Sequence, residues 1–332
     1  MRRLLSVATV LAALWCGWWW LASSAMSTAV AKQLDDLRAK GWNISVTEVS
    51  TSGFPFNLRQ DLDKLSLVDP SKTAFKFSDL TLEAKAYWPG HVTLTLPQEP
   101  ITIIQNDVQV FAQFDNAQAR LRLRPGLALQ LQSISVISGP LQINAPRGNI
   151  VIAQELGLFL RQNATSDLTY DFTLDAVDLA PGDALRATLD IPPDAPNTFD
   201  TVSVAGSLRF DQVVDRGLLN GRTPQLDALA LTQAEILWGD LGLSLTANAF
   251  LESDGTPEGT LNARIQSWEK LLEYVRRAGG LSEAEQRRTT TMLTVFANMS
   301  GTGKDIDLVL ESKDGALNLN GIALGPTPAL LR

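Results

Sequence analysis

Side chains that could carry out catalysis are scarce in this sequence. His91 is the only histidine, and Cys16, inside an apolar run, is the only cysteine. Metal sites of imidazole or thiolate ligands need several such groups, and a Ser-His-Asp triad would depend on His91, which lies in an expected turn. No G-x-S-x-G motif occurs, and the paired carboxylates Asp35 and Asp36 fall on the expected surface of a helix. We therefore expect no enzyme, no metal site and no cofactor.

The overall charge excludes one class of partner. The chain has 28 Lys and Arg against 36 Asp and Glu, which gives a formal net charge of −8. Proteins that bind phosphate backbones electrostatically carry a basic surface. We therefore expect no nucleic-acid partner. Because no cysteine lies outside the apolar run, the body of the protein must be stabilised by packing rather than by disulfides.

The segment Gly53-Phe54-Pro55-Phe56 is unusual for a surface loop. Two aromatic side chains flank a proline soon after the first expected strand. We interpret Gly53, Phe54 and Pro55 as a buried corner between the first two strands, with Phe54 inside. The alternative is that the same residues bind a partner.

The N-terminal segment has the composition of a membrane span. Two arginines precede an uncharged run from Leu4 to Ala22, which as a helix is roughly 28 Å long. The hydrocarbon layer of a bilayer is about 30 Å thick. We assign residues 1–26 as a transmembrane anchor that contacts the bilayer through residues 4–22, with the N-terminus in the cytoplasm. Residues 27–332 then form a body in the periplasm of a Gram-negative cell, held at the inner membrane.

Tryptophans favour retention of this anchor over cleavage. Trp18, Trp19 and Trp20 lie near the far end of the run, where indole rings prefer the membrane–water interface. A cleavable signal peptide has a shorter apolar centre and small residues at the cut. Ser23-Ser24-Ala25 would serve as such a cut, so cleavage is the alternative.

Alternation of apolar and polar residues dominates the body and predicts antiparallel strands with one wet face. Examples are residues 80–86, 92–96, 108–114, 170–174, 202–210, 241–251 and 261–265. Pro125-Gly126 and Asp314-Gly315 are hairpin signals between such runs. The expected fold is mainly β, with long curved antiparallel sheets or a β-sandwich or groove.

Helical spacing replaces this alternation in two places. Residues 27–40 predict a stalk helix that follows the anchor, and residues 267–299 predict two helices near the C-terminus. The proline-rich stretch within 190–200 is a possible boundary between two halves of the body.

An apolar sheet face of this length has to be covered. Two short helices cover only part of it, so the rest packs against a second sheet or lines an apolar groove suited to acyl chains. In the groove interpretation, the candidate lining residues are Val108, Val110, Phe114, Leu121 and Leu129. In the filled interpretation, the same side chains pack against each other.

Several short motifs resemble those of a bacterial family. They are Gly41-Trp42, residues 52–58 around Gly53-Phe54-Pro55, Trp88-Pro89, residues 314–321 and the closing residues 324–328. Together they resemble domain-of-unknown-function family 2125, which implies an N-terminal membrane segment but no known activity. More distantly, the one-sided strands and the D-G-x-L-x-L-x-G ending resemble envelope proteins of the AsmA-like type. That resemblance implies movement of phospholipid through an apolar β groove.

Two functions follow from this sequence. The first is a membrane-anchored periplasmic protein that binds or conveys lipid or another hydrophobic ligand in an apolar β groove. The alternative is a non-catalytic envelope scaffold or assembly factor that acts through contacts with other envelope proteins.

Overall fold

The computed structural model describes residues 2–126, 128–193, 195–252, 254–277, 283–299 and 303–329. The chain is mainly β, with 50% of its residues in strands and 21% in helices. The strands belong to two antiparallel sheets, as the alternation predicted. The chain divides into two compact units, Met1–Pro146 (unit 1) and Arg147–Arg332 (unit 2).

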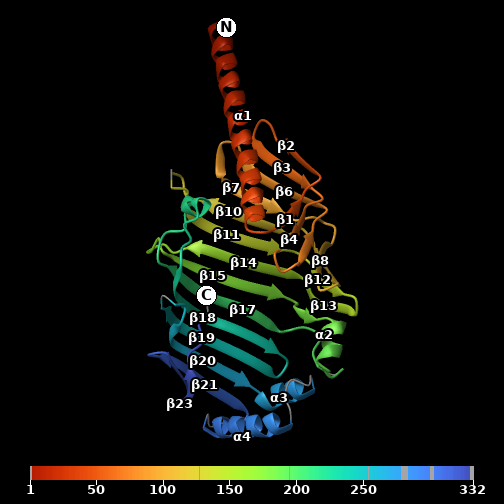
Figure 1. Cartoon of the computed structure of the whole chain (residues 1–332), viewed down its shortest axis with the longest axis vertical. Helices are drawn as coiled ribbons and strands as arrows, with labels where there is room; N and C mark the ends of the chain where they lie inside the picture. The colour runs from red at the N-terminus through yellow and green to blue at the C-terminus, as the bar shows by residue number, and fades with distance from the viewer. Residues whose placement is uncertain are drawn as a thin grey trace. The chain divides into compact units, whose positions relative to one another are not determined.

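Unit 1 contains helix α1 (Arg2–Ala39) and twelve strands in two sheets. One sheet has the order β2-β3-β6-β7-β10-β11 and the other β1-β4-β5-β8-β9-β12. The chain passes between the two sheets repeatedly (Figure 1). The strands are β1 (Asn43–Ser45), β2 (Glu48–Ser52), β3 (Asn57–Asp63), β4 (Ser66–Val68), β5 (Ala74–Lys76), β6 (Asp79–Lys85), β7 (Trp88–Thr95), β8 (Ile101–Gln105), β9 (Val108–Phe114), β10 (Gln118–Leu123), β11 (Leu131–Ser138) and β12 (Leu141–Ala145).

Unit 2 contains one long run of strands in the order β14-β15-β17-β18-β19-β20-β21-β22-β23, and a short pair β13-β16. Its strands are β13 (Gly148–Ala153), β14 (Glu155–Gln162), β15 (Thr169–Val177), β16 (Ala180–Pro181), β17 (Thr201–Phe210), β18 (Leu226–Trp238), β19 (Leu241–Leu251), β20 (Pro257–Gln266), β21 (Asp305–Lys313), β22 (Ala316–Leu319) and β23 (Ile322–Pro326). Its helices are α2 (Asp183–Thr188), the 3₁₀ turn η1 (Arg216–Asn220), α3 (Trp268–Arg277) and α4 (Glu283–Met299). The last two match the helices expected within 267–299.

Helix α1 contains both the segment assigned as an anchor and the expected stalk helix. The anchor and the predicted helix 27–40 form one continuous helix, because the serines between them do not interrupt it. Ser27 and Thr28 donate their hydroxyls to the carbonyls of Ser23 and Ser24 at 3.1 and 2.8 Å, inside the helix. The helix ends before Gly41, whose φ of +89° lies in the left-handed region that favours glycine.

Both predicted hairpins are present. Asp314 and Gly315 have φ of 51° and 70° and join β21 to β22, with Lys313 opposite Ala316. Two positive φ values at the turn are what a type I′ hairpin requires. At Pro125-Gly126, β10 and β11 also pair antiparallel. Leu127 lies outside the described residues.

The proline-rich stretch near 190–200 lies inside unit 2, where it connects α2 to β17. Strands β15 and β17, on either side of it, pair directly, with Leu174 opposite Val204. The chain before and after this stretch therefore belongs to one sheet. The division between the two compact units falls between Pro146 and Arg147 instead.

Candidate functional site

The strand run of unit 2 carries rows of apolar side chains across its strands. Residues opposite each other in neighbouring strands share a sheet face, so the register aligns the alternating apolar positions. Three rows on one face start at Leu156, Leu158 and Leu160 of β14, and we call them together the unit-2 apolar face. The middle row consists of Leu158, Leu174, Val204, Ala234, Leu245, Ala263 and Leu308.

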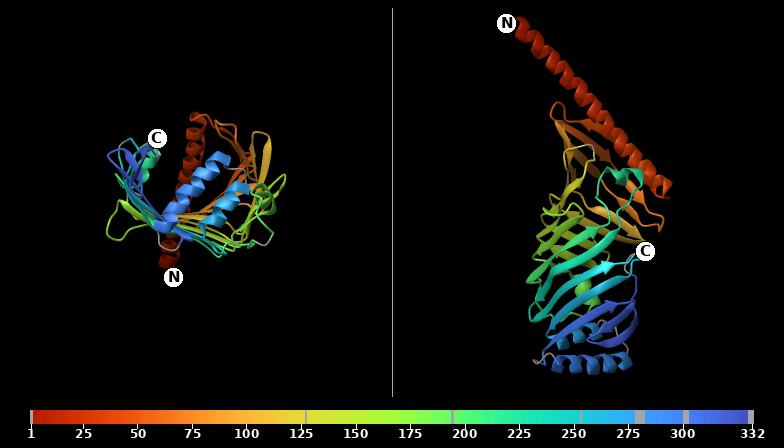
Figure 2. Two further views of the ribbon diagram at one scale, coloured as in Figure 1. Left: turned by 90° about the horizontal axis from the view of Figure 1, so that it is seen from below. Right: turned by 90° about the vertical axis from the view of Figure 1, so that its left-hand side faces the viewer.

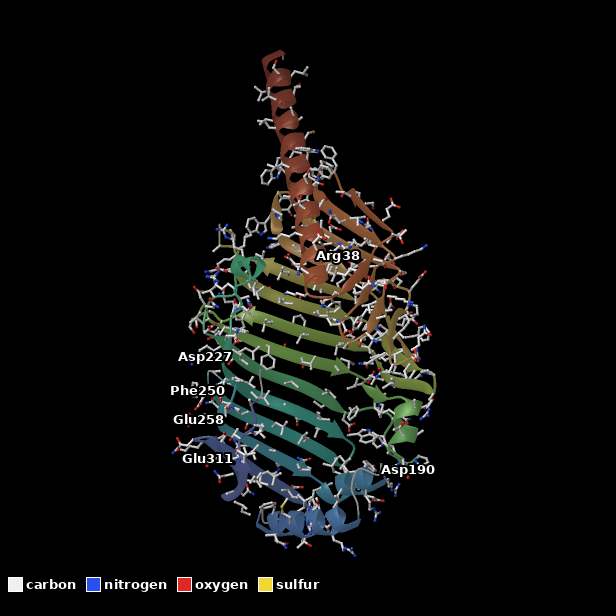
Figure 3. The ribbon with its side chains drawn as sticks, in the orientation of Figure 1. Arg38, Asp190, Asp227, Phe250, Glu258 and Glu311 are labelled. Carbon is white, nitrogen blue, oxygen red and sulfur yellow. The ribbon has the colours of Figure 1, made fainter. Side chains whose placement is uncertain are left out.

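The other face of the same strands is mainly polar, although Phe159 and Phe250 on it are 42% and 53% exposed. Arg209 donates to Asp227 at 2.7 Å, and the Ser203 hydroxyl donates to Asp175 at 2.9 Å across β15 and β17. Asp227, Phe250, Glu258 and Glu311 lie along one margin of the sheet (Figure 3).

Helices α3 and α4 cover one end of the unit-2 apolar face. Trp268, Phe296 and Ile306 are only 4%, 2% and 0% exposed and form a core between the two helices and β21. Ile265 and Leu308, at the β20–β21 end of the rows, pack against this core. Figure 1 shows α3 and α4 beside β20 and β21.

An ion pair helps to hold α3 in place. Lys270 in α3 donates to Asp240, in the turn between β18 and β19. This contact holds the pKa of the Asp240 carboxyl below its usual range, because the hydrogen bond and the charge of Lys270 favour the carboxylate. A ring contact also joins α3 to β18, since the Tyr274 ring packs against Trp238 with centroids 5.6 Å apart. The Trp238 ring in turn contacts Phe199, with centroids 5.3 Å apart.

The rest of the unit-2 apolar face is not covered by the described residues of that unit. In the middle row every side chain except Ala234 keeps solvent exposure, and Leu158 is 39% exposed. Ile236 in the neighbouring row is 36% exposed. Apolar patches of this extent on a soluble surface usually mark a binding site.

A pocket beside α4 combines apolar walls with guanidinium groups. Its volume is about 480 Å³. Its lining residues are Arg287, Arg288, Thr291, Met292, Val295, Phe296 and Ile322. Arginine forks suit phosphate groups, whereas the Met and Val side chains suit hydrocarbon. The pocket therefore has the chemistry to bind an anionic amphiphile.

Four of the five predicted lining residues come from two different sheets. Val108, Val110 and Phe114 lie in β9, whereas Leu121 lies in β10 of the other sheet, opposite Val92 and Ile134. Leu129 was wrongly expected in a strand. It precedes β11 with φ of 49°, so its direction does not follow the alternation of the strand.

The segment with Gly53, Phe54 and Pro55 connects β2 to β3. Gly53 has φ of 101°, and a Cβ there would lie 2.7 Å from the Asn57 carbonyl oxygen, so glycine is required. The expectation that Phe54 is buried is wrong, because its side chain is 55% exposed. It packs edge-to-face on Trp19 of α1, with ring centroids 5.4 Å apart, rather than in the interior.

The two reactive side chains named from the sequence, His91 and Cys16, both lie in unit 1. His91 is in β7 rather than in a turn, is exposed, and contacts the Trp88 ring with centroids 6.2 Å apart. Cys16 is an exposed free thiol in α1. Among the described residues, no group of three or more His, Cys, Asp or Glu side chains is placed to hold a metal ion.

Sequence reasoning missed the unit-2 apolar face as a site. The strands were recognisable, since residues 202–210 and 241–251 alternate clearly. Which strands are neighbours depends on which distant segments pair. Which apolar positions then align depends on the register of each pair. A bulge between Leu231 and Ala234 in β18, for example, shifts the pairing with β19 while leaving both residues on the same face.

Residues 19–328 match the family model described as an uncharacterized protein conserved in bacteria (DUF2125). Since the match covers nearly the whole chain, the protein belongs to this family, as its short motifs indicated. No curated protein matches the chain. By length and composition, α1 is apolar and long enough to cross a membrane.

Proposed function

We propose that this protein is a membrane-anchored, non-catalytic periplasmic protein that binds or conveys lipid through the unit-2 apolar face. The observation that carries the proposal is the exposure of aligned apolar rows in β14–β19, away from the cover of α3 and α4. An acyl chain would supply the missing cover. Each methylene removed from water contributes about 0.8 kcal/mol, so ten would contribute about 8 kcal/mol before the cost of association.

Two further features support a lipid as the ligand. The pocket beside α4 places Arg287 and Arg288 next to Met292 and Val295, which suits a phosphate headgroup with adjoining chains. Helix α1 supplies a candidate anchor in the membrane where lipids reside. The distant resemblance to AsmA-like proteins points the same way and stays a prediction.

The orientation of the anchor is part of the proposal. Arg2 and Arg3 at the start of α1 favour a cytoplasmic N-terminus under the positive-inside rule. The body would then lie in the periplasm, attached to the inner membrane. A reporter enzyme fused after residue 332 is expected to be active only in the periplasm, and cytoplasmic activity would contradict this orientation.

Site-specific photocrosslinking tests the lipid site. We would place a photoreactive amino acid in the full-length protein at Leu245 on the apolar face, or at Thr246, which points to the polar face and is exposed. Irradiation in intact cells and mass spectrometry should show a lipid adduct at 245 and none at 246. Adducts at neither position, or equally at both, would contradict the proposal.

The scaffold function is a second candidate, favoured by the last strand of unit 2. β23 ends the strand order, and Ile322 and Leu324 in it are 55% and 53% exposed. An unpaired strand edge can accept a strand from a partner. In the same photocrosslinking experiment, a protein adduct at Leu324 without any lipid adduct at Leu245 would favour the scaffold.

A further inference from the structure

Three tryptophans bind α1 to the strands of unit 1 and the loops between them through backbone carbonyls. The indole N–H of Trp15 donates to Pro55 at 3.0 Å, that of Trp18 to Ala86 at 2.8 Å, and that of Trp19 to Asn57 at 2.8 Å. Pro55 lies in the β2–β3 connection, Asn57 is the first residue of β3, and Ala86 lies between β6 and β7. The helix is therefore attached at a defined height along its axis.

Packing reinforces this attachment. Leu58, Ala84 and Ala86 are 1%, 3% and 0% exposed and form a core cluster in unit 1. The helix side chains packed against this cluster are Trp15, Trp19, Ala22 and Met26. The part of α1 from Trp15 onward is thus bound to the strands and does not act as a flexible tether.

Around this attachment lie large aromatic side chains that remain exposed. Phe54, Phe56 and Tyr87 are 55%, 65% and 66% exposed, and on the helix Trp18 and Trp20 are 45% and 68% exposed. We call Phe54, Phe56 and Tyr87 the aromatic tip. Three exposed aromatic rings from two loops, beside exposed tryptophans, form an apolar patch that soluble surfaces rarely carry.

The length of the free helix decides what this patch contacts. From Leu4 to Trp15 the helix rises only about 17 Å, against a hydrocarbon thickness of about 30 Å. The residues from Leu5 to Leu14 are all exposed, and the N-terminal part of α1 projects beyond the strands (Figure 2). A full span requires the helix as far as Ala22. The attachment at Trp15, Trp18 and Trp19 then brings the aromatic tip to the membrane.

We propose that unit 1 is docked on the bilayer, with the aromatic tip inserted at the boundary between headgroups and acyl chains. The proposal rests on the proposed membrane span of α1. Aromatic rings with one polar end favour this boundary, and Tyr87, Trp18 and Trp20 are of that kind. Next to the tip, the Lys85 ammonium donates to the Asn57 side chain at 3.0 Å, so polar groups lie beside the aromatic rings.

Fluorescence quenching of single cysteine variants tests the docking. We would reconstitute full-length Cys16→Ser protein in phosphatidylethanolamine–phosphatidylglycerol vesicles, with an environment-sensitive probe on Phe56→Cys or Tyr87→Cys. Val108→Cys is the matched control, since Val108 is 51% exposed in the same unit but lies in β9 of the other sheet. Lipids spin-labelled near the headgroup should quench positions 56 and 87. Aqueous cobalt should quench position 108 several-fold more than the other two.

A probe on Leu11→Cys separates this proposal from the membrane span itself. If lipid quenches position 11 while aqueous cobalt quenches 56 and 87 as strongly as 108, the span stands and the docking is wrong. If position 11 is also aqueous, the span fails and the docking with it. If 56 and 87 are shielded from cobalt but not quenched by lipid, the tip contacts protein, such as a second copy, and the docking is likewise wrong.

Discussion

In unit 1, α1 packs on the apolar side of β3 and β6, whereas in unit 2 the middle of a similar apolar face has no such layer. Leu58 and Leu62 are 1% and 5% exposed beneath the helix. Leu158 and Ile236, at comparable alternating positions in unit 2, are 39% and 36% exposed. The same strand pattern thus makes a core where another element covers it and an exposed apolar surface where none does. The following predictions test this difference.

The largest effect is expected for Leu58→Ala. Truncation of a fully buried leucine leaves a cavity and typically costs 2–5 kcal/mol, so about that loss is expected here. Leu174→Ala on the unit-2 apolar face should cost about 1 kcal/mol or less, because its side chain is only partly buried. Urea unfolding of the full-length variants measures both. An equal loss in the two variants would mean that the unit-2 face is covered in solution.

Lipid capture is expected to depend on substitutions in unit 2, on its apolar face. Leu245→Asp places a charge among the apolar rows and is expected to lower lipid capture at least tenfold, about 1.4 kcal/mol. Thr246→Asp adds the same charge on the polar face and should leave capture unchanged. The readout is phospholipid that copurifies with the protein, with circular dichroism to confirm folding. Equal capture by both variants would argue against a ligand on this face.

Trp19→Phe tests how α1 is held on the strands of unit 1. The variant keeps an aromatic ring against Phe54 but loses the hydrogen bond to the Asn57 carbonyl. A stability loss of about 1 kcal/mol is expected in chemical denaturation. Trp20→Phe is the control, since Trp20 is 68% exposed, and it should change little. A similar loss in both variants would contradict the specific role of Trp19.

The polar faces of the two units should behave alike, so the smallest effect is expected there. In unit 1, the hydrogen bond from Arg59 holds the pKa of the Asp61 carboxyl below its usual range, with Thr81 assisting. This contribution to stability is present above the unfolded pKa near 3.9 and is lost as the pH falls through the lower folded pKa. Asp61→Asn should therefore reduce stability at pH 7 by at most about 1 kcal/mol.

Thermal unfolding as a function of pH measures this. The Asp61→Asn and native proteins should converge at acid pH, where both side chains are neutral. In unit 2, Asp227→Asn, which breaks the pair with Arg209, should also cost little at pH 7. A loss of several kcal/mol in either variant would show that the polar faces also differ between the units.

Much of the fold was predictable because its signals are local. Alternation over residues 202–210 and 241–251 specifies strands, and Asp314-Gly315 specifies a hairpin through residues that tolerate positive φ. The candidate site was less predictable. Leu121 and Phe114 are both inward positions of strands, yet they lie in different sheets because the chain changes sheet after each pair of strands. Strand neighbours depend on pairing between distant residues, which no local pattern encodes.

Phe54 illustrates the same limit. Its aromatic character and the adjacent Gly53 and Pro55 indicated a special position, and the requirement for glycine at φ of 101° agrees. The sequence could not show whether the ring faces a core or the outside. That was decided by α1, which places Trp19 beside it and leaves the ring 55% exposed.

The sequence by itself determined the apolar helix, the strand-rich body and the scarcity of reactive side chains, because composition and spacing along one segment suffice for each. Only the tertiary structure decided that the anchor and stalk are one helix bound by three indole N–H groups. It also decided that the apolar rows of unit 2 are aligned and left open. Whether a residue is buried depends on the residues that pack on it, and those residues lie far from it along the chain.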